Sequence, residues 1–129
     1  MGSITLDTSR APLLLVRFDG AVDDDGFRAY LQQLTAWLDR GERYAIVLDA
    51  RTATPPQAAQ RRMQADMMKA ENVRLGKLCV GGAFVIPSPL VRGALTAILW
   101  IQPLPWEHTV VADVAAAEAW ARIRLARAT

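Results

Sequence analysis

Cys79 and His108 are the residues whose types could support nucleophilic chemistry, because the chain has one cysteine and one histidine. A cysteine nucleophile needs a base within hydrogen-bond reach and a third group that orients the base. The two residues fall in different predicted strands, so they could pair only if those strands are neighbours. A cysteine in an apolar strand is commonly unreactive, and His108 near a strand end needs no role. We therefore expect no enzyme, with a small enzyme that uses Cys79 and His108 as an alternative.

The aspartates Asp23 to Asp25 are the other cluster with chemical potential. Carboxylates bind divalent cations when a loop presents several of them around one point, but this triplet lacks the spacing of a calcium loop. It stands where a helix is predicted to begin, and the helix dipole favours negative charge there. The chain also lacks a glycine-rich phosphate loop and paired histidines at helical spacing. We expect neither a metal ion nor a cofactor.

The composition indicates one globular domain. The chain has 129 residues, of which 52% are hydrophobic and 22% are charged, and its formal net charge is +2. This small positive excess is not the strong basic field that favours nucleic-acid binding. One cysteine cannot form an intramolecular disulfide, and MGSITLDTSR lacks the regions of a signal peptide. We expect a single cytoplasmic domain over residues 1–129 that does not bind nucleic acid.

The pattern of apolar residues predicts the elements that must position these side chains. Strands are predicted over 4–8, 12–18, 44–50, 79–87 and 107–112, and helices over 23–41, 54–71, 89–101 and 113–126. The order ββαβαβαβα predicts an α/β fold, with a single-layer, mostly parallel β-sheet, an N-terminal antiparallel hairpin and about four helices.

Three local features refine this prediction. We expect the helix over 54–71 to begin with a capping box formed by Thr54 and Gln57, and to loosen near Asn72. Gly81 and Gly82 predict a bulge or a close backbone approach in their strand. The last helix is expected to present Ala116, Trp120 and Ile123 on one stripe.

Residues 85–105, VIPSPLVRGALTAILWIQPLP, contain the most apolar helical pattern of the chain. A membrane-spanning helix needs about 20 apolar residues, whereas Arg92 and the flanking prolines leave about a dozen. Ser88 is the expected N-cap and Pro89 the first helical residue. Because almost every face is apolar, we expect this helix to be largely buried, with Gly93 and Ala97 allowing close approach of the sheet or of a second copy.

The stretch CVGGAFVIPSPLVRGALTAILWIQPLP, followed by a strand and by AEAWAR, resembles the C-terminal half of small bacterial proteins with a STAS-like fold. These proteins are also grouped with SEC14-type domains and compared with anti-sigma-factor antagonists, and many have no known function. The likeness covers nearly the whole chain. It implies a non-catalytic regulatory or protein-interaction module of STAS-like type. The alternative that it implies is a SEC14-like carrier or sensor that binds a lipid or small apolar ligand.

The resemblance also implies two switch positions, Thr52 and Thr54. Anti-sigma-factor antagonists carry a Ser or Thr at the start of the helix after the central strand, where a phosphate can reach helix-end amides. Their Asp-Ser-Ser-Gly stretch is replaced here by ARTATPPQ. A threonine before proline is also what a structural N-cap requires, and we favour the cap as the interpretation.

A ligand or partner surface is predicted around the second and third predicted helices and the proline-rich bend that follows. Its residues are Met63, Met67, Met68, Ser88, Arg92 and Trp106. Methionine side chains adapt to partners of different shape. A pocket beneath the third predicted helix would be lined by Leu90, Leu95, Ile98, Leu99, Trp100 and the methionines, although the same residues could simply fill the core. We expect an unknown protein partner or a small apolar ligand, and a homodimer.

Overall fold

The computed structural model describes residues 2–128 and contains one five-stranded sheet. In chain order the elements are β1 (Ser3–Asp7), β2 (Leu13–Gly20), α1 (Asp24–Leu38), β3 (Tyr44–Ala53), α2 (Ala58–Ala70), α3 (Asn72–Leu78), β4 (Cys79–Val85), α4 (Pro89–Ile101), β5 (His108–Val111) and α5 (Val114–Ala128). The strands lie in the order β1-β2-β3-β4-β5. β1 pairs antiparallel with β2, and the other neighbours are parallel. The predicted fold class is therefore confirmed.

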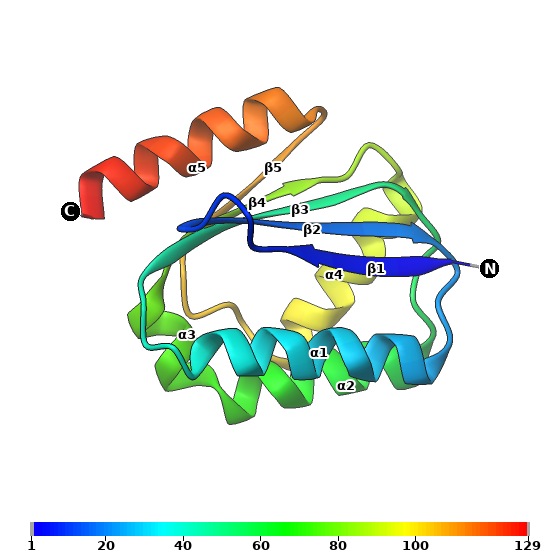
Figure 1. Cartoon of the computed structure of the whole chain (residues 1–129). Helices are drawn as coiled ribbons and strands as arrows, with labels where there is room; N and C mark the ends of the chain where they lie inside the picture. Colours follow the sequence, from blue (N-terminus) through cyan, green and yellow to red (C-terminus); the bar gives the residue numbers. More distant parts are fainter. Residues whose placement is uncertain (1, 129) are drawn as a thin grey trace.

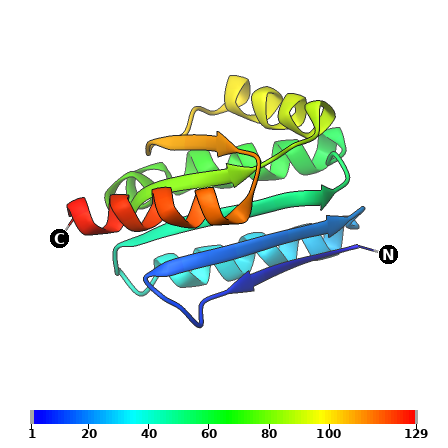
Figure 2. The same cartoon turned by 90° about the horizontal axis from the view of Figure 1, so that it is seen from above.

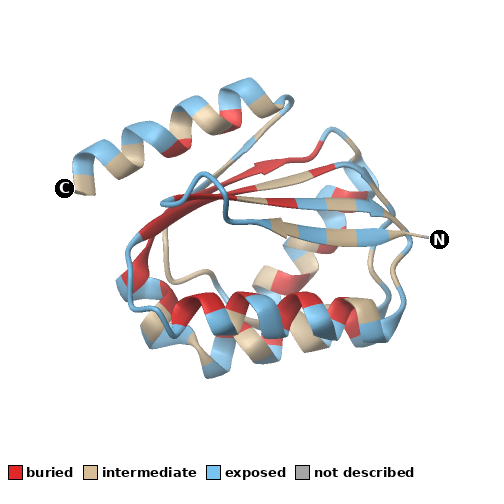
Figure 3. Ribbon diagram, in the orientation of Figure 1, coloured by how far each residue is buried: buried red, intermediate tan, exposed pale blue. Residues whose placement is uncertain are grey.

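The sheet separates two unequal layers of helices. α1, α2, α3 and α4 lie on one face, and α5 lies on the other (Figure 1). Seen from above, α4 lies toward the β5 side of the sheet and α1 lies beneath β1 and β2 (Figure 2). The central strand β3 begins with Tyr44–Val47, which are all buried, as expected for a strand covered on both faces. Buried residues gather on the central strands and on the helix sides that face them (Figure 3).

Helix α2 begins later than expected. Its N-cap is Gln57, whose side chain makes no capping hydrogen bond, so the predicted Thr54–Gln57 capping box is wrong. Thr54 instead donates its backbone N–H to the carbonyl of Gly20 at 3.3 Å. The physical reason is that each proline pushes the residue before it out of the α region, so Pro55 and Pro56 keep the chain extended.

The predicted loosening near Asn72 is a true break, after which α3 is a separate short helix, so residues 2–128 hold five helices and not four. A continuous helix would carry the charged Arg74 onto the methionine stripe. In the structure the Arg74 guanidinium donates to Glu71 at 2.7 Å and to Asp39 at 2.5 Å. Because of the break, the Arg74 guanidinium lies beside carboxylates and not among the apolar side chains of the methionine stripe.

Helix α5 packs through small residues. Ala117 and Ala121 are fully buried, whereas Ala116 and Ile123 are exposed, so the predicted stripe was wrong. Trp120 lies over Gly81 of β4, where a Cβ would come 2.9 Å from Cη2 of the indole. The predicted close approach at this glycine is therefore confirmed. Within residues 2–128, no helix is long and apolar enough to cross a membrane.

Helix α4 has the predicted bounds, but it is less buried than expected. Ser88 accepts a hydrogen bond from the backbone N–H of Val91, which confirms the N-cap, and Pro89 opens the helix. Val91, Ala94 and Ile98 are buried, while the opposite side faces solvent. The burial prediction was wrong because α4 lies near the edge of the sheet. One side of the helix packs against the core there, and within residues 2–128 the other side has no neighbouring element to cover it.

Candidate functional site

An apolar pocket of about 210 Å³ lies between the sheet and the helices α1, α2 and α4. The sheet contributes side chains of β1, β2, β3 and β4, such as Phe18, Ile46, Leu48 and Phe84. The helices contribute Phe27, Tyr30 and Leu34 from α1, Gln60, Gln64, Met67 and Met68 from α2, and Val91, Ala94, Leu95, Ile98 and Leu99 from α4. The loop after β3 adds Thr54, Pro55 and Pro56. Pockets of this apolar character are the usual sites of small ligands.

Gln60 is the buried polar side chain beside the pocket. Only 5% of it is exposed, and its amide nitrogen donates to the carbonyl of Val22 at 2.7 Å and to Asp24 Oδ1 at 3.1 Å. These bonds tie the start of α2 to the start of α1. The amide is therefore held in a fixed position, as a buried polar group requires.

Trp106 lines the same pocket near β4. Its ring stacks on Phe84 with centroids 6.2 Å apart and an interplanar angle of 14°. The ring also lies against Gly82, where a Cβ would come 2.5 Å from Cη2 of the indole. In the described part of the chain, the buried indole Nε1 of Trp106 has no hydrogen-bond partner. The buried indole Nε1 of Trp37, which does not line the pocket, is also without a partner in the described residues. A buried donor without an acceptor is costly.

The predicted surface residues divide between this pocket and its border. Met67, Met68 and Trp106 line the pocket, while Met63 packs against the core cluster that surrounds it. Ser88 caps α4, and Arg92 donates from Nε to the carbonyl of Ile86 at 2.5 Å. Of the residues expected beneath α4, Leu95, Ile98 and Leu99 line the pocket. Leu90 and Trp100 do not, because both point to solvent.

The pocket also contains residues that the sequence did not point to, namely Phe18, Leu48 and Ala50 of the strands and Phe27 of α1. A strand residue that lines a pocket has the same periodicity as one that packs against a helix. No signal in the pattern of apolar residues distinguishes the two cases.

The outer face of α4 is a second notable surface. The exposed fractions of Trp100, Leu90 and Ile101 are 84%, 75% and 45%. At 100° per residue these three fall with Gly93 and Ala97 within an arc of about 100°. Apart from its chain neighbours and the backbone of its own helix, no atom of residues 2–128 lies within 4 Å of where a Cβ of Gly93 would be. We call the five residues the outer stripe of α4.

Cys79 and His108 lie on neighbouring strands, because β4 pairs with β5, but the structure does not place them as a catalytic pair. His108 is opposite Gly82 in the register and packs edge-to-face on Phe84 at 5.8 Å. Cys79 is buried, and its thiol contacts the carbonyl oxygen of Gly81 at 3.5 Å. Burial raises the pKa of this thiol to about 12, so it carries no thiolate near neutral pH.

The aspartate triplet is engaged in structural contacts. Asp23 is the N-cap of α1 and accepts from the backbone N–H of Gly26 at 2.7 Å. Asp24 accepts from Gln60, and Asp25 pairs with Arg28 at 3.0 Å. Across residues 2–128, no three His, Cys, Asp or Glu side chains are grouped to hold a metal ion.

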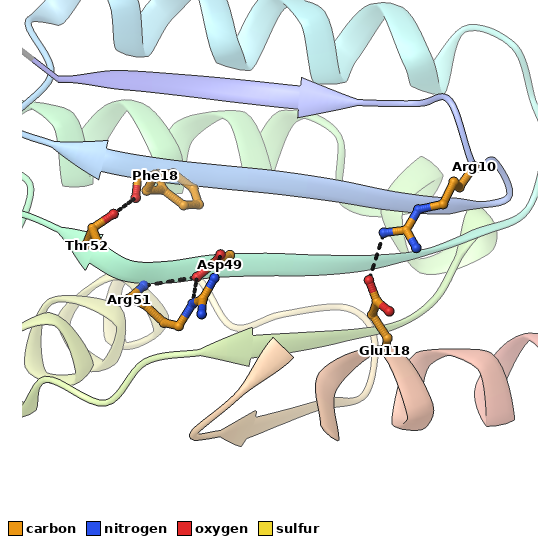
Figure 4. A network of polar contacts seen from close by, with 6 residues as sticks. All are labelled: Arg10, Phe18, Asp49, Arg51, Thr52 and Glu118. Carbon is orange, nitrogen blue, oxygen red and sulfur yellow. Dashed lines mark hydrogen bonds and ion pairs between the residues drawn. The ribbon is translucent and has the colours of Figure 1, made fainter. Parts of the chain in front are cut away.

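The two threonines lie where β3 ends, and both are exposed. The hydroxyl of Thr52 donates to the carbonyl of Phe18 at 3.4 Å (Figure 4). Thr54 precedes the two prolines and lies three residues before the N-cap of α2. A phosphate on either residue stays a prediction of the resemblance.

Comparisons with known proteins identify the fold. A scan against family models and a search of curated proteins found no match. Among solved structures, the chain is similar to an uncharacterized DUF3478-family protein from Shewanella loihica PV-4 with a SpoIIAA-like fold, at a TM-score of 0.69 and 14% identity, covering 94% of this chain and 95% of that one.

Two anti-sigma factor antagonists are similar as well. The antagonist SpoIIAA, in its unphosphorylated form, has a TM-score of 0.63 and 15% identity, and the alignment covers 95% of this chain and 98% of that chain. An antagonist from Mycobacterium paratuberculosis has a TM-score of 0.61 and 15% identity, with 95% of both chains covered. The chain therefore has the STAS-like fold of the anti-sigma factor antagonists, as the sequence predicted.

Proposed function

We propose that this protein is a non-catalytic protein-interaction module of STAS-like type, and that the outer stripe of α4 binds a second copy of the chain. The observation that carries the proposal is the exposure of Trp100, at 84%. Tryptophan is enriched among the residues that dominate binding energies at interfaces. An exposed tryptophan with leucine and isoleucine beside it is costly in water unless it serves a contact.

The shape of the outer stripe supports pairing with itself. Gly93 leaves a gap between Leu90 and Trp100, and no side chain of the described residues fills it. Glycine within a helix costs about 1 kcal/mol relative to alanine, and close approach of another backbone is a common reason to retain it. In a two-fold pair, a large side chain of one copy would enter the gap of the other. The stripe carries no charged residue, so the pairing would bury no unpaired charge.

Light scattering and thermal melts on Trp100→Ala test this proposal. The unchanged chain should have twice the mass of one chain. The variant should have the mass of one chain and should keep the melting temperature of the folded monomer, because Trp100 contributes little to its own core. Thr96→Leu, on an exposed position of the same helix outside the stripe, is the matched control and should leave the dimer intact. A monomeric unchanged chain at high concentration contradicts the proposal.

The apolar pocket favours a second candidate function, the SEC14-like carrier or sensor of a small apolar ligand. The support is the pocket between the sheet and α4, whose volume of about 210 Å³ is large compared with the empty spaces normally found in a protein core. Native mass spectrometry of the freshly purified protein tests this function. A bound small molecule that is released on unfolding supports it, and a protein that stays empty in the presence of every apolar probe contradicts it.

A further inference from the structure

We propose that the pocket binds a small uncharged aromatic molecule with one hydrogen-bond acceptor, and not a two-chain lipid or a fatty acid anion. This inference rests on the carrier function proposed above and names the class of its ligand. It follows from the volume of the pocket, the charge of its lining and the unpartnered indole N–H of Trp106.

The volume limits the size of the ligand. A cavity of about 150 Å³ lined by aliphatic and aromatic side chains can hold benzene. The pocket here has about 210 Å³, or about 1.4 times that volume. A substituted single ring or a compact double ring fits this space. The two acyl chains of a membrane lipid need several times this volume.

The lining limits the charge of the ligand. Among the described residues that line the pocket there is no Asp, Glu, Lys, Arg or His. Burying an unpaired carboxylate or ammonium group in such surroundings is strongly unfavourable. At the pocket border, Asp24 accepts from Gln60, and the guanidinium groups of Arg61 and Arg92 donate to the backbone carbonyls of Pro56 and Ile86. A fatty acid anion would therefore find no cation inside.

The lining also favours an aromatic ring. Phe18, Phe27, Tyr30, Tyr44, Phe84 and Trp106 contribute rings to the pocket wall. Several already meet edge to face, as Phe18 and Tyr30 do at 5.5 Å and 77°. Aromatic pairs prefer such edge-to-face or offset contacts, which give a flat ligand directional contacts that a flexible chain cannot use.

The acceptor on the ligand is inferred from Trp106. Its Nε1 is buried and has no partner in the described residues, although the same ring is fixed by Phe84 and Gly82. A carbonyl or ether oxygen on the ligand would satisfy this donor. A buried indole N–H commonly finds such a partner.

Binding of three probes of matched size tests the proposal by calorimetry at pH 7. Acetophenone is uncharged and has a carbonyl acceptor, α-methylstyrene replaces that oxygen with carbon, and benzoate is charged. Acetophenone should bind most tightly, α-methylstyrene should bind more weakly because it has no acceptor for the Trp106 N–H, and benzoate should bind at least about tenfold more weakly than acetophenone. Decanoate is the fourth probe and represents a single-chain fatty acid anion. Equal binding of benzoate and acetophenone would overturn the proposal.

Variants locate the site. Ala94→Leu fills the pocket from α4 and should lower the affinity for acetophenone at least about tenfold. Thr96→Leu, an exchange to leucine on the same helix but outside both the pocket lining and the outer stripe, should leave the affinity unchanged. If Ala94→Leu does not fold, Ala50→Val narrows the pocket from β3. Unchanged affinity in a folded pocket-filling variant would overturn the proposal.

Trp106→Phe tests the hydrogen bond. This variant should change the affinity ratio of acetophenone to α-methylstyrene by a factor of about five in favour of the hydrocarbon, because the ring remains and the N–H is lost. An unchanged ratio would exclude the indole as the donor. Binding of decanoate without either uncharged aromatic probe would keep the carrier function and overturn this inference. If none of the four probes binds, the carrier function fails as well.

Discussion

The indole ring of Trp106 packs directly against the backbone of Gly82 in β4. The indole lies so close to β4 that a Cβ on Gly82 would come 2.5 Å from Cη2 of Trp106 and 3.1 Å from Cγ2 of Ile46. On the other face of the same strand, Gly81 admits Trp120 of α5 in the same way. Adjacent residues of a strand point to opposite faces, so the glycine pair lets one tryptophan approach each face of β4.

Gly82→Ala should lower the free energy of unfolding by about 1–3 kcal/mol, because the new methyl group overlaps the ring of Trp106 and the β4 backbone cannot retreat. Urea denaturation measures this loss. In a Trp106→Leu background the same exchange should cost clearly less, since the two residues are in direct contact. Equal costs in both backgrounds would show that the ring does not enforce glycine.

Gly93→Ala should raise the free energy of unfolding, whereas Gly82→Ala should lower it. Nothing lies within 4 Å of the added methyl group, and the exchange removes the helix cost of glycine. Measured in the Trp100→Ala background, which should be monomeric, the exchange should gain up to about 1 kcal/mol in urea denaturation. A loss of stability would mean that the space above Gly93 is filled.

Cys79 should react slowly with a thiol reagent while the protein is folded, and fully after unfolding in urea. The cause is burial, which raises the pKa of the thiol from 9.0 to about 12. Because the folded pKa is the higher one, the contribution of this group to stability is complete below about pH 9 and is lost as the pH rises toward about 12. Cys79→Ala should therefore flatten the decline in stability over this range. Fast labelling of the folded protein would contradict the buried position.

The start of α2 offers a test of helix capping. Gln57→Asp should stabilise the protein by about 0.5–1 kcal/mol, because aspartate can accept from the free N–H groups that Gln57 leaves without a side-chain partner. Thr54→Ala should change stability by less than about 0.5 kcal/mol, since Thr54 caps no helix. Asp23→Ala, which removes the working cap of α1, is the control and should cost about 1 kcal/mol in thermal melts.

Asp49 and Arg51 should make stability depend on acid pH. The Arg51 guanidinium donates to both carboxylate oxygens of Asp49 at 2.9 Å, as Figure 4 shows. These bonds hold the pKa of Asp49 below its usual value of 3.8. The stabilisation is therefore complete above about pH 4 and disappears as the pH falls through the lower folded pKa. Asp49→Asn should cost up to about 1 kcal/mol at pH 7 and little at pH 2, measured by urea denaturation.

Asp25→Asn is the matched control for this pH dependence. Its carboxylate pairs with Arg28, but 93% of the side chain is exposed. Such a surface pair contributes little, so the control should change stability by a few tenths of a kcal/mol at most at either pH. If both variants behave alike, the Asp49–Arg51 pair has no special role.

The order of elements could be predicted because it depends on local physical properties. Apolar runs, proline positions and turn residues determine where a segment can be helical or extended, and they placed α1, α4 and the five strands correctly. The start of α2 was misplaced because the local signals conflicted. Thr54 and Gln57 have the spacing of a capping box, while two prolines between them keep the chain extended.

The sequence by itself determined the fold class, the start of α1 at the aspartate triplet, the N-cap of α4, and the glycine pair as a site of close approach. Only the tertiary structure decided which apolar residues are covered. Ile98 and Trp100 are both large apolar residues of the same helix, so the sequence pattern predicts burial for both. In the structure Ile98 lines a pocket and Trp100 is exposed. The physical reason is that burial depends on which surfaces meet across the layers. These contacts join residues far apart in the chain, such as Gly82 and Trp106, and a local sequence pattern cannot predict such pairs.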